Sequence, residues 1–324
     1  MRAVYVDVDD LGTEPGRSLL EEAGFHVMEA HCHTPADVIG AADGASAILV
    51  GSVRITREVL TALPDVGIVS TMSAGTDHVD LEAARDLGVW VCNVPDAATD
   101  EVAVHALAMA LSLVRHLPFF DRQVRRGVWR LTGTGPVRRP ASMTLGLVGI
   151  GRIGRRVAEL ARPVFRRILA CDPFLPEASW PANAERAELG ELFASSHVVS
   201  LHVPLTRTTR GLVDAARLRS MPVGSYLVNV SRGELVNLSD LISLLEIGHL
   251  AGAALDVLPE EPPRRDHPIL RHPRVLLTPH VAFLSEESAT EYSWKQATNV
   301  IEWSKTGRPE RVVAEPPVPR GRPS

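Results

Sequence analysis

The sequence has few cysteines and no large excess of either charge. Its three cysteines, Cys32, Cys92 and Cys171, are scattered and odd in number, which argues against a disulfide framework or a CxxC metal pair. The 34 basic and 39 acidic residues nearly cancel, so neither nucleic acid nor an anionic membrane is the expected partner. We expect a protein that acts on a small molecule and holds no metal.

The sequence also lacks any long apolar run. Asp7, Asp9 and Asp10 interrupt the N-terminus before the apolar core of a signal peptide can form, and no later run approaches membrane-spanning length. Together with the scattered cysteines, this predicts a cytoplasmic protein. A chain of 324 residues is long for one hydrophobic core, so two domains are expected.

Short β-branched runs recur along the chain, and a stretch with helical spacing follows each of them. Four such runs start at Ala3, Ala47, Gly67 and Val89, and a second series of about six runs extends from Thr144 to His280. This alternation predicts an α/β fold with two Rossmann-like or flavodoxin-like domains built on parallel sheets.

Helical patterns join and follow the two series. The segment from Thr99 can be capped by Thr99 or Asp100 and repeats apolar residues every three or four positions, which predicts a connecting helix. A second helix is predicted from Ser285 to the Gly at position 307. Residues 308–324 are rich in Pro and Arg and are predicted to form a loose tail.

A glycine-rich loop indicates a dinucleotide site. Gly149, Gly151 and Gly154 form GxGxxG directly after a predicted strand and open a helix near Arg152. In this setting the glycines allow a tight turn, close approach to a pyrophosphate and helix packing, and the helix N-terminus favours the phosphates. Asp172 ends the next strand, where its carboxylate would accept the adenosine ribose hydroxyls and repel a 2′-phosphate. NAD is therefore expected in preference to NADP.

Three polar side chains end strands of the second series. Arg232, Glu261 and His280 are the residue types that reduction of a 2-oxo acid requires. A guanidinium can bind the carboxylate and polarise the carbonyl, and an imidazolium held charged by a carboxylate can protonate the alkoxide. Each residue alone has an ordinary explanation as a surface charge or as one of twelve histidines.

Taken together, the motifs resemble a known family. "SAGTDHVDL", "LVGIGRIG", "LHVPLT", "NVSRGELVN", "GAALDVLPEEP" and "TPHVAFLSEES" occur in order between about residues 45 and 306. They are similar to the successive signatures of the D-isomer-specific 2-hydroxyacid dehydrogenases. "CNVPDAATDE" and "HVAFLSEES" further resemble the branch that contains the C-terminal-binding-protein corepressors.

The resemblance implies a domain organisation and a set of roles. It places a substrate domain at 1–97 plus 285–324 and an NAD-binding domain at 98–284, with homodimers joined through the NAD domains. It implies that Arg232 orients the substrate and that Glu261 and His280 form a proton-transfer dyad. The implied substrate-binding residues are Ser73, Ala74, Gly75, Arg232 and Phe283. The implied cofactor-binding residues are Gly149, Gly151, Arg152, Ile153, Gly154, Asp172, His202, Val203, Pro204, Thr209, Val230, Ser231, Asp256, His280 and Ala282.

Some points stay open on the sequence alone. The corepressors carry Trp-Tyr where this chain has Phe283 and Leu284, which changes the pocket wall and leaves the 2-hydroxy acid unidentified. His202 serves as an extra acid or, as the simpler interpretation, lines the cleft or satisfies local backbone. An alternative to the enzyme is an NAD(H)-sensing interaction protein of the corepressor type, and turnover of a 2-oxo acid would distinguish the two. Formate oxidation is disfavoured because Glu261 stands where formate dehydrogenases carry Gln, and phosphite oxidation because Ala74 stands where those relatives carry Lys.

Overall fold

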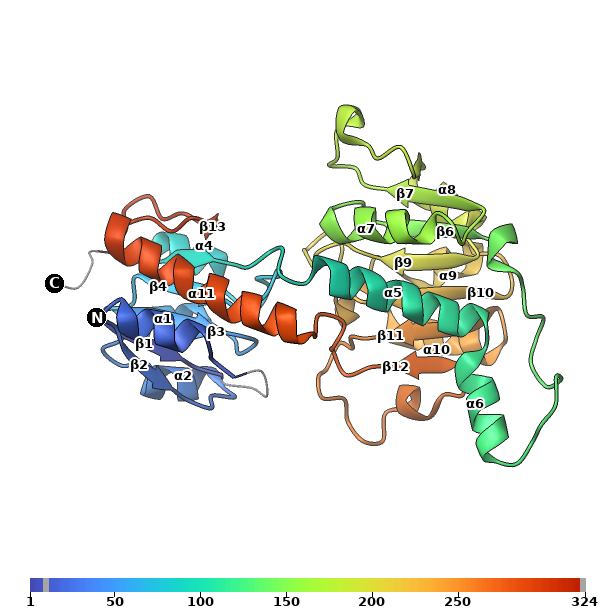
Figure 1. Cartoon of the computed structure of the whole chain (residues 1–324), viewed down its shortest axis with the longest axis horizontal. Coiled ribbons are helices and arrows are strands. Elements are labelled where there is room, and N and C mark those ends of the chain that lie inside the picture. Colours follow the sequence, from blue (N-terminus) through green and yellow to red (C-terminus); the bar gives the residue numbers. More distant parts are fainter. Residues whose placement is uncertain (8–11, 321–324) are drawn as a thin grey trace. The chain divides into compact units, whose positions relative to one another are not determined.

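The computed structural model describes residues 1–7 and 12–320; Asp9, Asp10 and the last four residues of the C-terminal segment lie outside the described residues. The chain divides into two compact units (Figure 1). We call Met1–Ala97 plus Ser285–Ser324 the split unit and Ala98–Leu284 the central unit. Each is described by itself.

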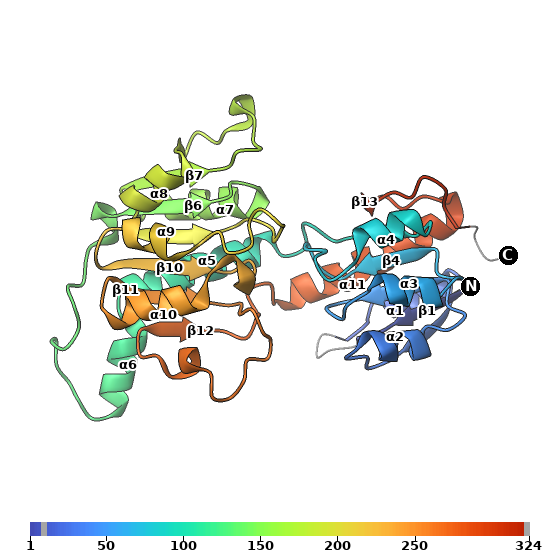
Figure 2. The ribbon, with the colours of Figure 1, turned by 180° about the vertical axis from the view of Figure 1, so that it is seen from behind.

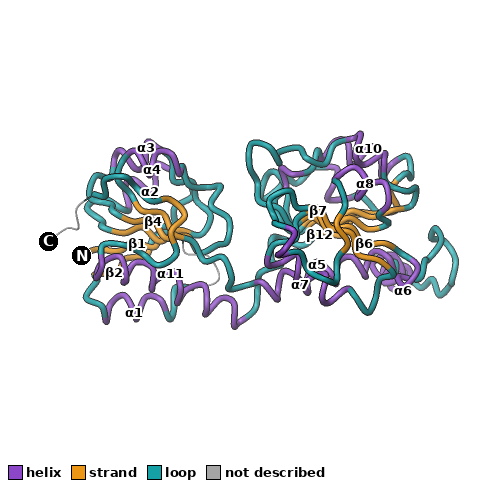
Figure 3. Tube along the Cα trace, turned by 90° about the horizontal axis from the view of Figure 1, so that it is seen from above, coloured by secondary structure: helices purple, strands orange, loops and turns teal. Residues whose placement is uncertain are grey.

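The split unit is built on a six-stranded sheet. In spatial order its strands are β2 (His26–Glu29), β1 (Arg2–Tyr5), β3 (Ala47–Val50), β4 (Ile68–Thr71), β5 (Trp90–Cys92) and β13 (Val312–Ala314). The first five are parallel, in the order of a doubly wound sheet. One face carries the helices α1 (Gly16–Glu22) and α11 (Glu286–Thr306), and the other carries α2 (Pro35–Ala41), α3 (Arg57–Ala62) and α4 (Leu81–Asp86), as Figure 3 shows.

The central unit is built on a seven-stranded parallel sheet. In spatial order its strands are β8 (Glu185–Arg186), β7 (Arg167–Cys171), β6 (Thr144–Val148), β9 (Val198–Leu201), β10 (Ser225–Asn229), β11 (Leu250–Leu255) and β12 (Val275–Leu277). One face is covered by α5 (Thr99–Val114) and α7 (Arg152–Ala161), and the other by α8 (Leu189–Ser195), α9 (Ala215–Ser220) and α10 (Leu238–Glu246) (Figures 2 and 3). Helix α6 (Leu117–Arg125) follows α5, and the order of strands reverses between β6 and β9.

The fold class predicted from the sequence is confirmed, with some differences of detail. The pattern missed β2, β8 and β13, and the central sheet has seven strands instead of about six. Strand β13 pairs antiparallel with β5, so the sheet of the split unit is not wholly parallel. Within the described residues no single helix is long and apolar enough to cross a membrane; only α5 and α6 taken together reach that length, and they are bent by 62°.

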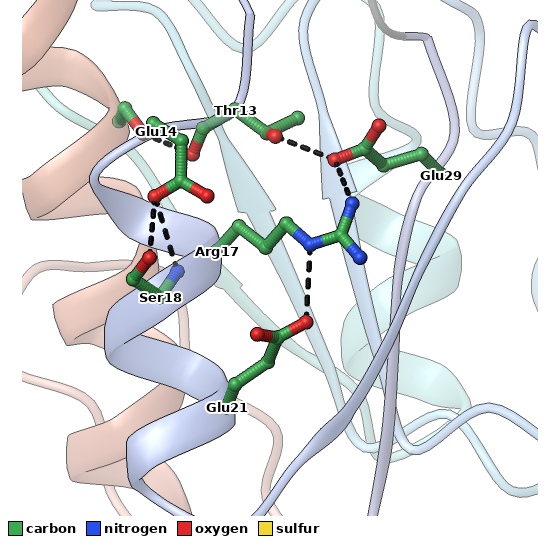
Figure 4. Close-up of polar contacts among 7 residues, drawn as sticks. Thr13, Glu14, Arg17, Ser18, Glu21 and Glu29 are labelled. Atoms are coloured by element: carbon green, nitrogen blue, oxygen red, sulfur yellow. Dashed lines mark hydrogen bonds and ion pairs between the residues drawn. The ribbon is translucent and has the colours of Figure 1, made fainter.

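Polar contacts fasten α1 to the sheet of the split unit (Figure 4). The Arg17 guanidinium contacts Glu21 one turn along the helix and Glu29 in β2, each at 3.0 Å. The Thr13 hydroxyl donates to Glu29 at 2.6 Å and, with Arg17, holds the pKa of Glu29 below its ordinary value against the effect of partial burial. On the other side, the Thr13 carbonyl accepts from Ser293 of α11. These bonds explain how a helix of seven residues keeps a fixed place between a strand and a long helix.

The prediction of a loose C-terminal tail is wrong for the part of the tail that the structure describes. Residues Val312–Ala314 form β13, and the backbone N–H of Arg320 donates to Gly88 at 2.8 Å. The Arg320 guanidinium donates to the carbonyls of Leu60, Leu63 and Val66, at 2.8 to 3.1 Å. The prediction rested on Pro and Arg content, whereas the pairing of β13 and the bonds of the Arg320 guanidinium determine the structure.

Replacing Arg320 with Ala should therefore destabilise the protein. Three partly buried carbonyls lose their donor, and an unmet hydrogen bond of this kind costs on the order of 1–3 kcal/mol. Urea unfolding followed by circular dichroism measures the loss. Arg57→Ala is the matched control, because the Arg57 guanidinium forms an exposed ion pair with Asp86 and its loss should have a smaller effect. An equal effect of the two changes would mean that the tail contributes nothing beyond a surface charge.

Candidate active site

The predicted polar residues of the central unit all follow the carboxyl ends of its parallel strands. Because the strands of a parallel sheet end at the same edge, these loops meet there. The loops that follow β6, β7, β9, β10, β11 and β12 carry Gly149 to Gly154, Asp172, His202 to Thr209, Val230 to Arg232, Asp256 to Glu261 and Thr278 to Phe283, respectively. The reversal of strand order between β6 and β9 lies at the centre of this edge, where open α/β sheets bind ligands.

The glycine loop after β6 is shaped for close approach. Gly149 has φ 93°, and a Cβ there would lie 2.4 Å from the carbonyl oxygen of His202. A Cβ on Gly154 would lie 2.3 Å from the carbonyl oxygen of Gly149. A Cβ on Gly151 would meet no atom within 4 Å. Packing therefore requires the first and third glycines, whereas the space at the second is open toward a ligand.

The start of α7 supplies donors to that space. In the described part of the chain no acceptor takes a hydrogen bond from the backbone N–H of Gly151, Arg152 or Ile153. Unpaired N–H groups at the first turn of a helix bind phosphates, helped by the helix dipole. The residues present thus fit the pyrophosphate of a dinucleotide.

Asp172 lies beside the glycine loop. Its carboxylate accepts from the N–H of Ile150 at 3.2 Å and from that of Phe174 at 3.1 Å. These two bonds hold the carboxylate at the end of β7 and leave further lone pairs for a ribose diol. Its predicted contact with the adenosine ribose stays a prediction.

His202 is held in a position that does not suit an acid. Its Nε2 contacts the Ser200 hydroxyl at 2.9 Å, and its Nδ1 has no hydrogen-bond partner among the described residues. Burial lowers the pKa of His202 to about 4, so the ring is neutral at pH 7. Of the roles left open by the sequence, lining the site or bonding to neighbouring groups fits better than proton donation. Thr209 stabilises the same loop by donating to the Pro204 carbonyl at 2.7 Å.

The loop after β10 is tied to its neighbours on both sides. The Ser231 hydroxyl donates to the Leu201 carbonyl at 2.7 Å, and the Asn229 side chain donates to the Arg232 carbonyl at 2.8 Å. A Cβ on Gly233 would lie 2.0 Å from the carbonyl carbon of Leu258. This close approach, which the sequence did not reveal, places the Arg232 loop directly against the loop that carries Glu261.

Glu261 and His280 form a hydrogen-bonded pair. Glu261 Oε2 lies 2.7 Å from His280 Nδ1, and Oε1 accepts from the Leu258 N–H at 2.7 Å. Burial raises the pKa of Glu261, but the bond and charge of His280, the Leu258 N–H and the charge of Arg232 together lower it below the ordinary value. The carboxylate is therefore ionised at neutral pH, beside both candidate cationic groups.

His280 itself is partly exposed and held in an unusual backbone conformation. Its φ of 54° lies in the left-handed region, which non-glycine residues adopt mainly where their surroundings impose it. Its side chain is 43% exposed, and Nε2 has no partner in the part of the chain that the structure describes. The Phe283 ring meets the imidazole edge to face at a centroid distance of 6.3 Å. An acid with one nitrogen anchored and the other open is the arrangement that proton transfer needs.

Asp256 is buried and turned toward the loop that carries His280. Its carboxylate accepts from the Thr278 hydroxyl and from the N–H groups of Val281 and Ala282, at 3.0 and 2.9 Å. Its carbonyl accepts from the His280 N–H at 2.7 Å. Asp256 thus shapes this loop, a role that the sequence did not predict; its implied role in cofactor binding stays a prediction.

The predicted substrate loop belongs to the split unit and follows β4. The Ser73 hydroxyl donates to the Gly75 carbonyl at 2.6 Å, and Asn93 donates to the Ala74 carbonyl at 2.8 Å. No acceptor among residues 1–7 and 12–320 takes a hydrogen bond from the N–H of Ala74 or Gly75. Two adjacent unpaired N–H groups on a fastened loop fit a carboxylate.

Comparison with known proteins identifies the family. The family model "D-isomer specific 2-hydroxyacid dehydrogenase, NAD binding domain" matches residues 107–282. The glyoxylate reductase of Thermofilum pendens is 33% identical over 93% of this chain and 91% of its own length. The D-3-phosphoglycerate dehydrogenase of Archaeoglobus fulgidus is 34% identical over 84% of this chain, which spans 51% of that protein. A D-lactate dehydrogenase from Aquifex aeolicus, solved with NAD and lactic acid, superposes with a TM-score of 0.85 at 25% identity, over 98% and 100% of the two chains.

The fold and the glycine loop define an NAD-dependent 2-hydroxyacid dehydrogenase, that is, an oxidoreductase that interconverts 2-oxo and 2-hydroxy acids. The chain belongs to the D-isomer specific 2-hydroxyacid dehydrogenase family. The relatives named here are a glyoxylate reductase, a phosphoglycerate dehydrogenase and a lactate dehydrogenase rather than corepressors. These relatives therefore do not support the prediction that the chain belongs to the branch of the C-terminal-binding proteins.

Proposed function

We propose that this chain reduces a small 2-oxo acid to the D-2-hydroxy acid with NADH, using Arg232, Glu261 and His280. The 2.7 Å contact between Glu261 and His280 carries the proposal, because it anchors one imidazole nitrogen and leaves Nε2 open. Bound NADH supplies the hydride that adds to C2 of the oxo acid. His280 Nε2 donates the proton to the carbonyl oxygen, so that one oxo acid, one NADH and one proton give one hydroxy acid and NAD⁺.

The charges of the site support this direction of proton flow. The ionised Glu261 stabilises the imidazolium of His280 before transfer, and its bond to Nδ1 holds the ring in one orientation. The charge of Arg232 contributes to the lowered pKa of Glu261. Its planar guanidinium can donate hydrogen bonds to both the substrate carboxylate and the carbonyl oxygen. In the reverse direction the neutral imidazole takes the proton from the hydroxyl.

We assign residues 98–284 to cofactor binding and residues 1–97 plus 285–324 to substrate binding. The unpaired N–H groups of Ala74 and Gly75 support the second assignment, because they can receive the substrate carboxylate. Phe283 would contribute an apolar wall beside His280. The physiological substrate is of the 2-oxo or 2-hydroxy acid class.

Turnover decides between this function and NAD(H) sensing. Purified protein is mixed with NADH or NADPH and with glyoxylate, pyruvate, hydroxypyruvate and longer 2-oxo acids, and the absorbance of the reduced cofactor is followed. The product is then resolved on a chiral column. D-2-hydroxy acid formed preferentially with NADH supports the proposal. Tight NADH binding without turnover of any oxo acid would favour the sensing protein instead.

We further propose that two copies associate through α6 and the segment that follows it. Helix α6 has no buried residue, and Trp129 and Leu131 are 86% and 96% exposed. The exposed apolar side chains of this arm are Leu117, Val124, Val128, Trp129, Leu131 and Val137. Several exposed apolar side chains within one short segment of a folded protein indicate an interaction surface. A second copy is the occupant that the family resemblance implies.

Replacing Trp129 and Leu131 together with Ser should convert a dimer into a monomer. The two side chains are the most exposed apolar groups of the arm, and each would be desolvated on association. Light scattering after gel filtration at micromolar concentration measures the mass. Ile247→Ser, which alters a 75% exposed apolar side chain after α10, is the control and should leave the dimer intact. A monomeric parent protein would refute this part of the proposal.

Cytoplasmic location remains part of the proposal. All three cysteines are free in the structure, and Cys32 and Cys92 are buried. Free buried thiols suit a reducing compartment. Cell fractionation with an antibody against the chain tests the location.

A further inference from the structure

A second histidine lies behind the loop that carries His280. His105 is on α5, which packs against β10 and β11 of the central unit. Its Nε2 lies 3.1 Å from the Thr278 hydroxyl and 3.7 Å from Asp256 Oδ1. The His105 side chain is 24% exposed and does not form part of the predicted catalytic set.

The protons in this contact can be assigned from the donors and acceptors present. The single hydroxyl proton of Thr278 is donated to a carboxylate oxygen of Asp256. Thr278 Oγ1 must therefore accept at its contact with His105. The proton of that contact belongs to His105 Nε2, so a directed chain runs from the imidazole through the hydroxyl to the carboxylate.

At the far end of this series of hydrogen bonds, Asp256 holds the loop that carries His280. Asp256, 2% exposed, uses its two oxygens to fix the N–H groups of Val281 and Ala282, the two residues directly after His280. His280 has a left-handed backbone, which persists only where neighbouring contacts determine it. A carboxylate free to rotate would release both N–H groups together.

We propose that His105 is a positioning residue for the reaction: by donating to Thr278 it locks the Asp256 carboxylate and thereby sets the direction of His280. The inference rests on the proposed function, because it assumes that His280 transfers the proton. His105 acts through its contacts with Thr278 and Asp256. Its requirement is for an Nε2 donor, not for an imidazole as such.

That requirement defines the variants. His105→Leu removes the donor, whereas His105→Gln keeps an N–H at a similar reach. We expect His105→Leu to lower kcat about 10-fold or more, because misplacing a reacting group by about 1 Å can cost up to about 10²-fold. NADH affinity, measured by fluorescence titration, should change less than about twofold. His105→Gln should recover most of kcat.

A double-mutant cycle tests whether the effect passes through Thr278. Thr278→Val removes the hydroxyl that links His105 to Asp256. If the chain is real, kcat of the double variant His105→Leu/Thr278→Val should be no lower than that of Thr278→Val alone. If the losses of kcat in the two single variants instead multiply in the double variant, His105 does not act through Thr278.

His116→Leu is the matched control. His116 follows the same helix at its other end, and its Nε2 contacts the Tyr226 hydroxyl at 3.0 Å. Both substitutions remove one histidine–hydroxyl bond from the central unit. His116→Leu should lower the melting temperature but leave kcat unchanged. Equal loss of kcat in both variants would mean that His105 matters only for stability.

Hydrogen exchange separates this inference from the proposed function. Peptides that span residues 278–283 should exchange faster in His105→Leu than in the parent or in His116→Leu, because the Asp256 carboxylate that accepts from the Val281 and Ala282 amides is then held less firmly. This readout needs no turnover, so it holds even if no 2-oxo acid is reduced. Unchanged exchange in His105→Leu would overturn the positioning role whatever the activity of the enzyme.

Discussion

Replacing His280 with Ala should lower kcat/KM for both reduction and oxidation by roughly 10² to 10⁴, the usual contribution of a positioned general acid or base. NADH binding should persist, because the glycine loop and Asp172 are untouched. His202 cannot compensate at neutral pH, since burial keeps its imidazole neutral. Stopped-flow or steady-state kinetics in the two directions measure the loss.

The same dyad sets the pH dependence. His280 must be protonated to reduce an oxo acid and neutral to oxidise a hydroxy acid, so the two directions should have opposite pH profiles. The pKa of Glu261 is lowered in the folded protein, so its negative charge is present from mildly acidic pH upward and is lost only as the pH falls through that lowered value. Throughout the neutral range the charge favours the imidazolium.

Glu261→Gln removes the charge and keeps the size of the side chain. Loss of that charge removes the partner of the protonated acid, so the alkaline limb of kcat/KM for reduction should move toward acid, and oxidation should extend in the same direction. His272→Ala, at the opposite end of β12, is the control and should move neither limb. An unmoved alkaline limb in Glu261→Gln, or full activity in His280→Ala, would exclude the relay.

The strands that the sequence revealed are those buried on both faces. β4, β9 and β10 consist of apolar and small polar residues that are all buried, and such strands read as continuous hydrophobic runs. β2 buries one residue of four and β8 none, so neither leaves a pattern. β13 could not be predicted because it pairs with β5, which lies more than 200 residues away in the sequence. Local composition carries no information about such a contact.

The candidate site shows the same division. Arg232, Glu261 and His280 could be predicted because their chemistry is recognisable and each follows a strand. The contacts that hold them could not be predicted, because they depend on close approaches between loops, such as Gly233 against Leu258. His105 gave no signal beyond a polar residue in an apolar helix, and only its distance to Thr278 distinguishes it.

Replacing Arg232 with Lys should abolish most of the activity although the charge is kept. Lys offers a single point of donation, whereas the guanidinium can hold carboxylate and carbonyl oxygens at once. Loss of such a preorganised donor costs on the order of 10²-fold or more in kcat. Because Gly233 packs closely against Leu258, the backbone at Arg232 is held in place. The loop therefore cannot shift to bring a Lys ammonium to both substrate groups.

The measurement is kcat/KM for the best 2-oxo acid, with NADH affinity determined separately. Arg210→Lys is the matched control, because Arg210 pairs with Glu234 at the surface near the same loop and should tolerate the change. Adding guanidine to Arg232→Ala provides the complementary arm: the free cation should restore part of kcat if the planar fork is what the reaction needs. Near-normal kcat/KM in Arg232→Lys would place Arg232 outside the reacting centre, and substrate polarisation would then have to come from the imidazolium of His280 alone.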